Sequence, residues 1–231
     1  GKKGREISFD PTEFRQMEKD GRMPNLMLLQ LPSNHTNGAT PGVSSAKAMV
    51  ADNDLALGKI VEAISKSRFW SKTAIFVVED DAQDGPDHVD AHRSVAFVIS
   101  PYAKRGFVDR TLYSTTSMLR TMELILGLPP MSQYDAAATP MANAFMKTPT
   151  PAGFSALRAT WDLEERNPAK SFGEDLMDTF DLSEPDAAPD RAFNEVIWAS
   201  IKGTTMPAPR YSVFSRITLE DNLDDDLHQK H

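Results

Sequence analysis

The chain has 231 residues, 40% of them hydrophobic, and a formal net charge of −8, so it is long enough to bury roughly 70% of its unfolded surface in a core. The acidic balance excludes nucleic acid as the main partner, because phosphate backbones recruit an excess of Lys and Arg. The chain has no cysteine, which excludes disulfides and thiolate zinc ligands. No apolar run approaches the roughly eighteen residues of a membrane span.

The first half of the chain alternates between helical and extended patterns. Pro11 opens a short helical pattern that Gly21 ends. Residues 26–31 form a continuous apolar run of strand length, which is typical of a buried parallel strand. Residues 44–67 carry apolar side chains at three- and four-residue spacing and predict a long amphipathic helix.

Two further apolar runs, residues 73–78 and 95–99, predict strands on either side of an acidic loop. Alternation of strands and helices predicts right-handed parallel crossovers. We therefore expect an α/β fold, with a mostly parallel sheet flanked by helices.

Three more helices are predicted around residues 115–126, 136–146 and 193–201. Prolines and acidic residues become frequent after residue 148. We expect residues 1–148 to form the α/β core, and residues 149–231 to form an irregular, helical tail that wraps the core with few strands.

The loop from Glu79 to Arg93 holds six carboxylates and two of the five histidines of the chain. It lies between two predicted strands, and ligands of open α/β proteins bind where such strands end. Like charges at this density repel one another unless a cation neutralises them. The loop therefore predicts a metal site, although an acidic loop that is solvated at the rim of the sheet is the plainer alternative.

Four residues are the candidate metal ligands. Asp80 and Asp81 follow a predicted strand directly, His92 stands just before the next strand, and His35 lies in the turn after the run 26–31. Carboxylates and imidazoles suit Zn, Mn, Mg or Ca, and the histidines favour Zn or Mn over Ca alone. The residue types do not decide which metal is bound.

Three neighbouring residues are candidates for binding a substrate. Asn34 can hold a phosphate oxygen, and His88 can donate a hydrogen bond to the substrate, bind the metal or pack in the loop. Arg93 can bind a phosphate oxygen in a bidentate manner or simply pair with a neighbouring Asp.

The sequence resembles the bacterial phosphoesterase family of the alkaline phosphatase superfamily, which includes phospholipase C and acid phosphatase-like enzymes. The acidic loop is the most specific part of the resemblance, and three other blocks support it. The matching blocks are Leu31–Gly38, Glu79–Arg93, Ser132–Met141 and Phe193–Gly203.

The resemblance implies a metal-dependent hydrolase of phosphate esters that uses two divalent ions, of Zn, Mn or Ca, and it favours a periplasmic or secreted location. Members of the family carry their Ser or Thr nucleophile, and a first metal-binding acid, on an N-terminal half that would precede Gly1. The chain therefore resembles the C-terminal half of an alkaline phosphatase-like core, with no nucleophile of its own. The missing half is expected as a partner, in the same chain or in another. The rival hypothesis is a noncatalytic module that binds a metal or a partner.

Overall fold

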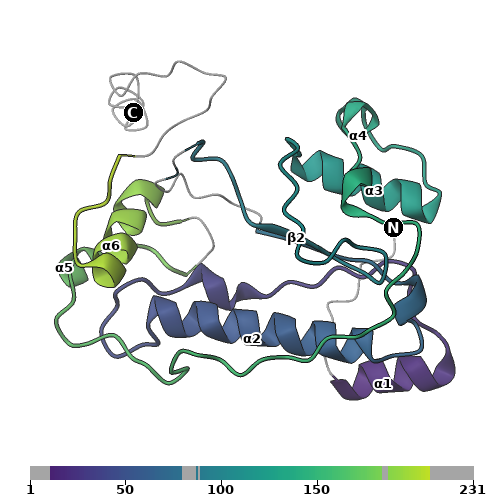
Figure 1. Ribbon diagram of the computed structural model, residues 1–231. Coiled ribbons are helices and arrows are strands. Elements are labelled where there is room, and N and C mark those ends of the chain that lie inside the picture. Colours follow the sequence, from purple (N-terminus) through teal and green to yellow (C-terminus); the bar gives the residue numbers. More distant parts are fainter. Residues whose placement is uncertain (1–10, 80–86, 88, 184–186, 209–231) are drawn as a thin grey trace. The chain divides into compact units, whose positions relative to one another are not determined.

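The computed structural model describes residues 11–79, 87, 89–183 and 187–208. Helices dominate this part of the chain, and two short strands accompany them (Figure 1). The α-helices are α1 (Pro11–Asp20), α2 (Ala46–Ser65), α3 (Thr115–Leu126), α4 (Gln133–Ala137), α5 (Glu174–Met177) and α6 (Asp190–Lys202). The 3-10 helices are η1 (Pro32–His35), η2 (Trp70–Lys72) and η3 (Ala142–Ala144), and the strands are β1 (Ile75–Val78) and β2 (Ala96–Ile99).

Contacts divide the chain into two compact units that interleave along the sequence. Unit 1 takes Gly1–Pro32, Asn53–Val78 and Ala96–Ala159, and unit 2 takes Ser33–Asp52, Glu79–Val95 and Thr160–His231. Unit 1 holds the strand pair, and all of the described site residues predicted from the sequence belong to unit 2. The domain boundary expected at residue 148 stays a prediction.

The two strands pair with each other in an antiparallel manner, with Ile75 opposite Ile99 and Val78 opposite Ala96. The mixture of helices and strands agrees with the predicted α/β class. The predicted parallel pairing is not found among the described residues, where the sheet has two strands only. Parallel strands need a crossover connection, usually a helix, and the described residues between β1 and β2 form no helix.

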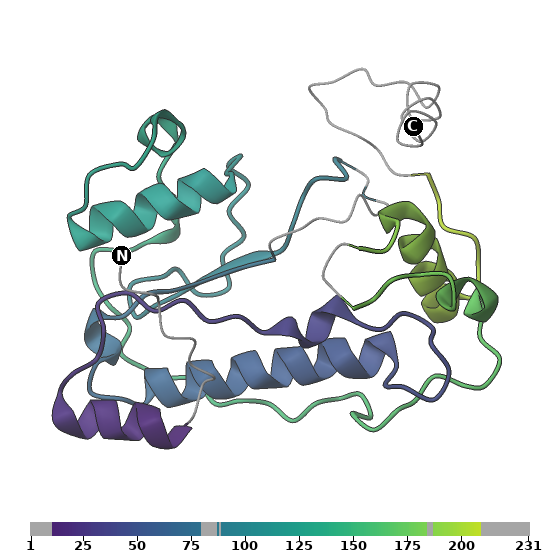
Figure 2. The same ribbon diagram turned by 180° about the vertical axis from the view of Figure 1, so that it is seen from behind.

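The predicted strand at residues 26–31 is not a strand in the structure. Residues 24–31 run as an extended stretch that belongs to no sheet (Figure 2). No backbone hydrogen bond joins them to another part of the described chain. The side chain of Leu28 is 87% exposed. Extended backbone becomes a β-strand only when a neighbouring strand accepts and donates its hydrogen bonds, and no described segment does so here.

The core of unit 1 lies where α1 packs beside the C-terminal end of α2. Phe14, Ile60, Ile64 and Trp70 are buried together, and Met23 and Leu31 pack against them from the two ends of the extended segment. The ring of Phe154 meets that of Trp70 edge to face, with 6.1 Å between the ring centroids.

The core of unit 2 gathers around α6. Met177, Phe193 and Val196 are buried against Ala39. The preceding Gly38 has a positive φ of 54°, and a Cβ atom built there would lie 2.6 Å from Cε2 of Phe193. Only glycine allows both this backbone conformation and this close approach.

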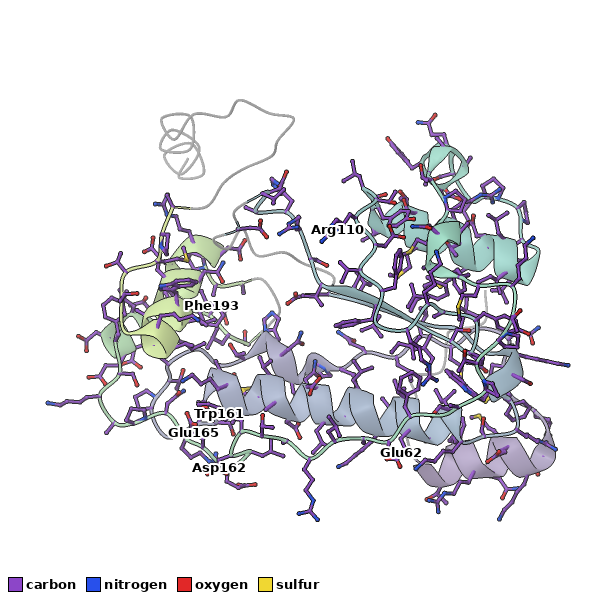
Figure 3. The ribbon with its side chains drawn as sticks, viewed as in Figure 1. Glu62, Arg110, Trp161, Asp162, Glu165 and Phe193 are labelled. Atoms are coloured by element: carbon purple, nitrogen blue, oxygen red, sulfur yellow. The ribbon has the colours of Figure 1, made fainter. Side chains whose placement is uncertain are left out.

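Segment 160–167 fastens the turn that follows η1 to the start of α2. Asn167 is buried and donates its side-chain amide to the carbonyl oxygens of Gly38 and Thr40, at 3.0 and 2.9 Å. The backbone N–H of Ser45 donates to the carbonyl of Glu165 at 3.0 Å. Glu165 and its neighbours Trp161 and Asp162 are labelled in Figure 3.

The single Ala-rich helix predicted at residues 136–146 is replaced by α4 and η3. Ala138 ends α4 with an extended backbone, at ψ 142°. Pro140 follows, and a proline disfavours helical geometry at the residue before it. The helices α1, α2, α3 and α6 confirm the other helical predictions to within a few residues.

Within the part of the chain that the structure describes, no helix is long and apolar enough to cross a membrane.

Candidate functional site

The carboxylate of Asp87 organises the second half of the acidic loop. Its Oδ1 accepts the backbone N–H of Val89 at 2.6 Å and that of Asp90 at 3.2 Å. The guanidinium of Arg93 donates to the same carboxylate through Nε at 3.1 Å and through Nη2 at 2.9 Å. Asp87 thus accepts the hydrogen bonds of a turn at residues 89 and 90, and it forms an ion pair with Arg93 at the end of the loop.

These contacts favour the ionised form of Asp87. The backbone hydrogen bond from Val89 is the largest cause, and the side-chain hydrogen bond from Arg93 is the next. Together they lower the pKa of Asp87 to about 2. The turn is therefore held by a charged carboxylate throughout the neutral range.

Asp90 repeats the arrangement two residues before His92. Its Oδ1 accepts the backbone N–H of His92 at 2.9 Å and lies 2.7 Å from Nδ1 of the same residue. The side chain of Asp90 is 15% exposed, whereas that of His92 is 60% exposed. The imidazole is thus held at Nδ1 by a largely buried carboxylate, although its own side chain is largely exposed.

Short contacts also join the two ends of the acidic loop. The backbone N–H of Glu79 donates to the carbonyl of Val95 at 3.1 Å, and the hydroxyl of Ser94 donates to the carbonyl of Glu79 at 2.6 Å. Glu79 is the last described residue before the predicted ligands Asp80 and Asp81. The backbone is therefore fixed on both sides of the stretch that carries them.

His35 and Asn34 lie in η1, and both are exposed. The turn is held on α2 by Ser33, whose hydroxyl donates to Asp52 at 3.3 Å. Thr36 follows with a positive φ of 44°, although it is not glycine, and it is buried. A conformation this costly persists only where its surroundings enforce it, and such residues gather at functional sites.

The structure links two of the predicted site residues, His92 and Arg93, through two aspartates that were not predicted. Asp87, Asp90, His92 and Arg93 form one hydrogen-bonded network. Asp80, Asp81 and His88 lie outside the described residues. Among the residues that are described, no group of three or more His, Asp or Glu side chains is arranged to hold a metal ion. The predicted ligand set thus stays a prediction.

The sequence leaves open whether Arg93 binds a phosphate oxygen or pairs with a neighbouring Asp. In the structure it pairs with Asp87. Asp87 and Asp90 themselves were missed as site residues by sequence reasoning. The residue type carried only a general signal, because Asp side chains commonly accept the backbone N–H two residues ahead in a turn. The segment contains this spacing twice, at Asp87 with Val89 and at Asp90 with His92.

Comparison with known proteins places these features in a family. The model of the Phosphoesterase family matches residues 3–129, which is more than half of the chain. The matched range contains both the turn with His35 and the acidic loop, and it ends before the blocks Ser132–Met141 and Phe193–Gly203. A search of curated proteins returns no match. The chain therefore belongs to the Phosphoesterase family.

Proposed function

We propose that the chain is the C-terminal part of a metal-dependent hydrolase of phosphate esters. Membership of the Phosphoesterase family supports the hydrolysis of phosphate esters. The observation that carries the metal proposal is the imidazole of His92, which a carboxylate holds at Nδ1 beside a run of acidic residues. A histidine that binds a metal through one ring nitrogen commonly donates the other to a carboxylate in this way.

The proposed ligands are His35, Asp80, Asp81 and His92, and they would hold two divalent ions of Zn, Mn or Ca. These donors are chemically suitable, since imidazole nitrogens and carboxylate oxygens bind such ions. Two bound ions would supply polarisation of the phosphoryl group and a lower pKa for the attacking hydroxyl or water. Among the described residues, His35 and His92 are both exposed, so an ion in solution can reach each imidazole.

Asn34, His88 and Arg93 are the proposed substrate-binding residues. Asn34 is exposed at η1 and offers an amide N–H to a phosphate oxygen. Arg93 already uses Nε and Nη2 on Asp87. Its contact with a phosphate therefore uses Nη1 or exchanges Asp87 for the substrate oxygen.

We further propose that an N-terminal half, in the same or another polypeptide, supplies the nucleophile and completes the sheet. Residues 24–31 support this proposal, because they are extended, apolar and without backbone partners in the described chain. A strand that is apolar on both faces is stable in the centre of a sheet, where neighbours cover both its edges. A periplasmic or secreted location is proposed on the family resemblance alone.

The test is Asp80→Asn in the complete enzyme, with a generic aryl phosphate ester as the substrate. Removing one charged ligand is expected to lower turnover at least about a hundredfold. Asp162→Asn is the matched control, because Asp162 caps a turn elsewhere through the backbone N–H of Glu164. Unchanged turnover in a folded Asp80→Asn enzyme would contradict the assignment.

The same assay separates the rival function. Elemental analysis that finds bound metal in the complete protein, together with no turnover of any aryl phosphate ester, would favour a noncatalytic metal-binding module. The motive for this rival is that the family resemblance leaves the chain without a nucleophile of its own.

A further inference from the structure

One oxygen atom of Asp90 makes two contacts with the same neighbour. Oδ1 accepts the backbone N–H of His92 and also lies against Nδ1 of its ring. The first contact fixes the backbone of His92, and the second fixes the rotation of the imidazole about its side-chain bonds. A single carboxylate oxygen therefore sets both the position and the direction of the ring.

Asp90 is itself held from both sides. Its backbone N–H donates to Oδ1 of Asp87 at 3.2 Å, and its carbonyl accepts the backbone N–H of Arg93 at 3.2 Å. Arg93 in turn clamps the carboxylate of Asp87. The carboxylate of Asp90 that contacts His92 is thus held by hydrogen bonds on both sides of the residue.

The contact also selects a tautomer of the neutral ring. An ionised carboxylate accepts hydrogen bonds but has no hydrogen to donate. In the neutral ring, the hydrogen between the two groups is therefore bonded to Nδ1. The lone pair is then at Nε2, which is the nitrogen able to bind a cation.

We propose that Asp90 is a positioning residue that holds His92 in the Nδ1–H tautomer with Nε2 directed at a divalent cation. The inference rests on the proposed function for the identity of the ion, but the tautomer itself does not depend on it. Loss of the hydrogen-bond partner of a metal-binding histidine typically lowers metal affinity about 10–100-fold.

The first experiment reads the tautomer in the 231-residue chain without metal. Long-range proton–nitrogen NMR is recorded at about pH 8.5, well above the ordinary pKa of histidine, and His92→Gln assigns the signal. We expect Nδ1 to be protonated in the wild type. In Asp90→Ala the hydrogen is expected to redistribute toward Nε2, and Asp90→Asn should restore the wild-type pattern because the amide oxygen still accepts.

The second experiment titrates Zn²⁺ alone into the same chain by calorimetry. Asp90→Ala is expected to weaken Zn²⁺ binding about 10–100-fold, and Asp90→Asn less than about tenfold. Asp162→Ala is the control, because it removes an aspartate whose Oδ1 also caps the backbone N–H two residues ahead, at 3.0 Å, with no imidazole attached.

The outcomes separate the two proposals. A wild-type ring protonated at Nε2, or an Asp90→Ala ring that keeps Nδ1–H, overturns the positioning role whatever the metal does. A tautomer that depends on Asp90, with equal Zn²⁺ affinity in wild type and Asp90→Ala, also overturns it. A wild-type chain that binds no Zn²⁺ while its tautomer depends on Asp90 contradicts the metal site of the proposed function, and with it the role of Asp90 toward an ion.

Discussion

Two segments of this chain contrast in how they are held. Residues 89–93 sit in unit 2 and are tied to Asp87 and Asp90 by hydrogen bonds to nearly every turn position. Residues 24–31 sit in unit 1, carry four exposed apolar side chains and make no backbone hydrogen bond with another part of the described chain. The first segment contains its own hydrogen-bond acceptors, whereas the second has no backbone hydrogen-bond partner among the described residues.

The difference shows which part of a site can be built locally. A polar turn can satisfy its backbone with carboxylates a few residues away, so its geometry survives without neighbours. An apolar strand gains stability only when other strands cover its edges and faces. We therefore expect the site loop to be formed in this chain by itself, whereas residues 24–31 would join a sheet only with the proposed N-terminal half.

The largest effect is expected for Leu28→Asp in the complete protein. If residues 24–31 are buried there, an unpaired charge lowers the free energy of unfolding by about 3 kcal/mol or more. In the 231-residue chain, where Leu28 is 87% exposed, the change should stay within about 0.5 kcal/mol. Urea denaturation measures both. Leu157→Asp is the control, at a leucine that is 85% exposed. If both variants lower the free energy of unfolding of the complete protein equally, residues 24–31 are not buried there.

Gly38→Ala tests how tightly the chain after the turn with His35 packs against Phe193 and Met177. The added methyl group would meet Phe193 and Met177 at 2.6 and 2.9 Å, so overpacking should cost about 1–3 kcal/mol. Gly42→Ala is the matched control, because Gly42 also has a positive φ, of 76°, but a Cβ there meets no atom within 4 Å. Thermal denaturation should rank Gly38→Ala well below Gly42→Ala, and equal stabilities would show that the packing around Gly38 is not tight.

A smaller effect is expected for Asp87→Ala, which removes the acceptor at the centre of the site loop. Amide hydrogen exchange of Val89 and Asp90 should accelerate about tenfold, the loss expected for a hydrogen bond to a charged group. Asp181→Ala, which removes a similar contact with the backbone N–H of Ser183 at 2.9 Å, should leave both amides unchanged. Exchange that is unaffected by Asp87→Ala would mean that other contacts hold the loop.

The smallest effect is the acid titration of the same loop. The pKa of Asp87 is lowered from 3.8 to about 2 in the folded chain, so its stabilising effect is complete above about pH 4. It is lost as the pH falls through about 2, since protonation then removes the ion pair with Arg93. The amide shift of Val89 should follow this titration in NMR. Residues 24–31 carry no titratable side chain, and an equal response there would indicate general unfolding instead.

Sequence patterns predicted the helices α1, α2, α3 and α6 because each had a local period or a local stop. Gly127 and Gly203 end α3 and α6 as expected, each with a left-handed backbone. The patterns were less informative about which face is buried. Helix α3 buries Ser117, Thr121 and Glu123, while Ile125 is 56% exposed. Periodicity locates an apolar stripe, but only tertiary neighbours decide whether anything covers it.

The site divides in the same way. His92 was predicted from its place before a strand, and that place is confirmed by β2, which begins at Ala96. The partner of its ring was not predicted, because six carboxylates in fifteen residues leave many pairings open. Asp90 and Asp87 make these contacts because of the local turn geometry. That geometry depends on backbone angles, which the composition of the loop does not reveal.

The exposed segment also bears on how the protein should be prepared. Leu26–Leu31 is six residues long, uncharged and free of proline, which are the properties of peptides that stack into intermolecular β-sheets. Samples of these 231 residues should therefore self-associate as the concentration rises, and light scattering over a range of concentrations would show the concentration at which this begins.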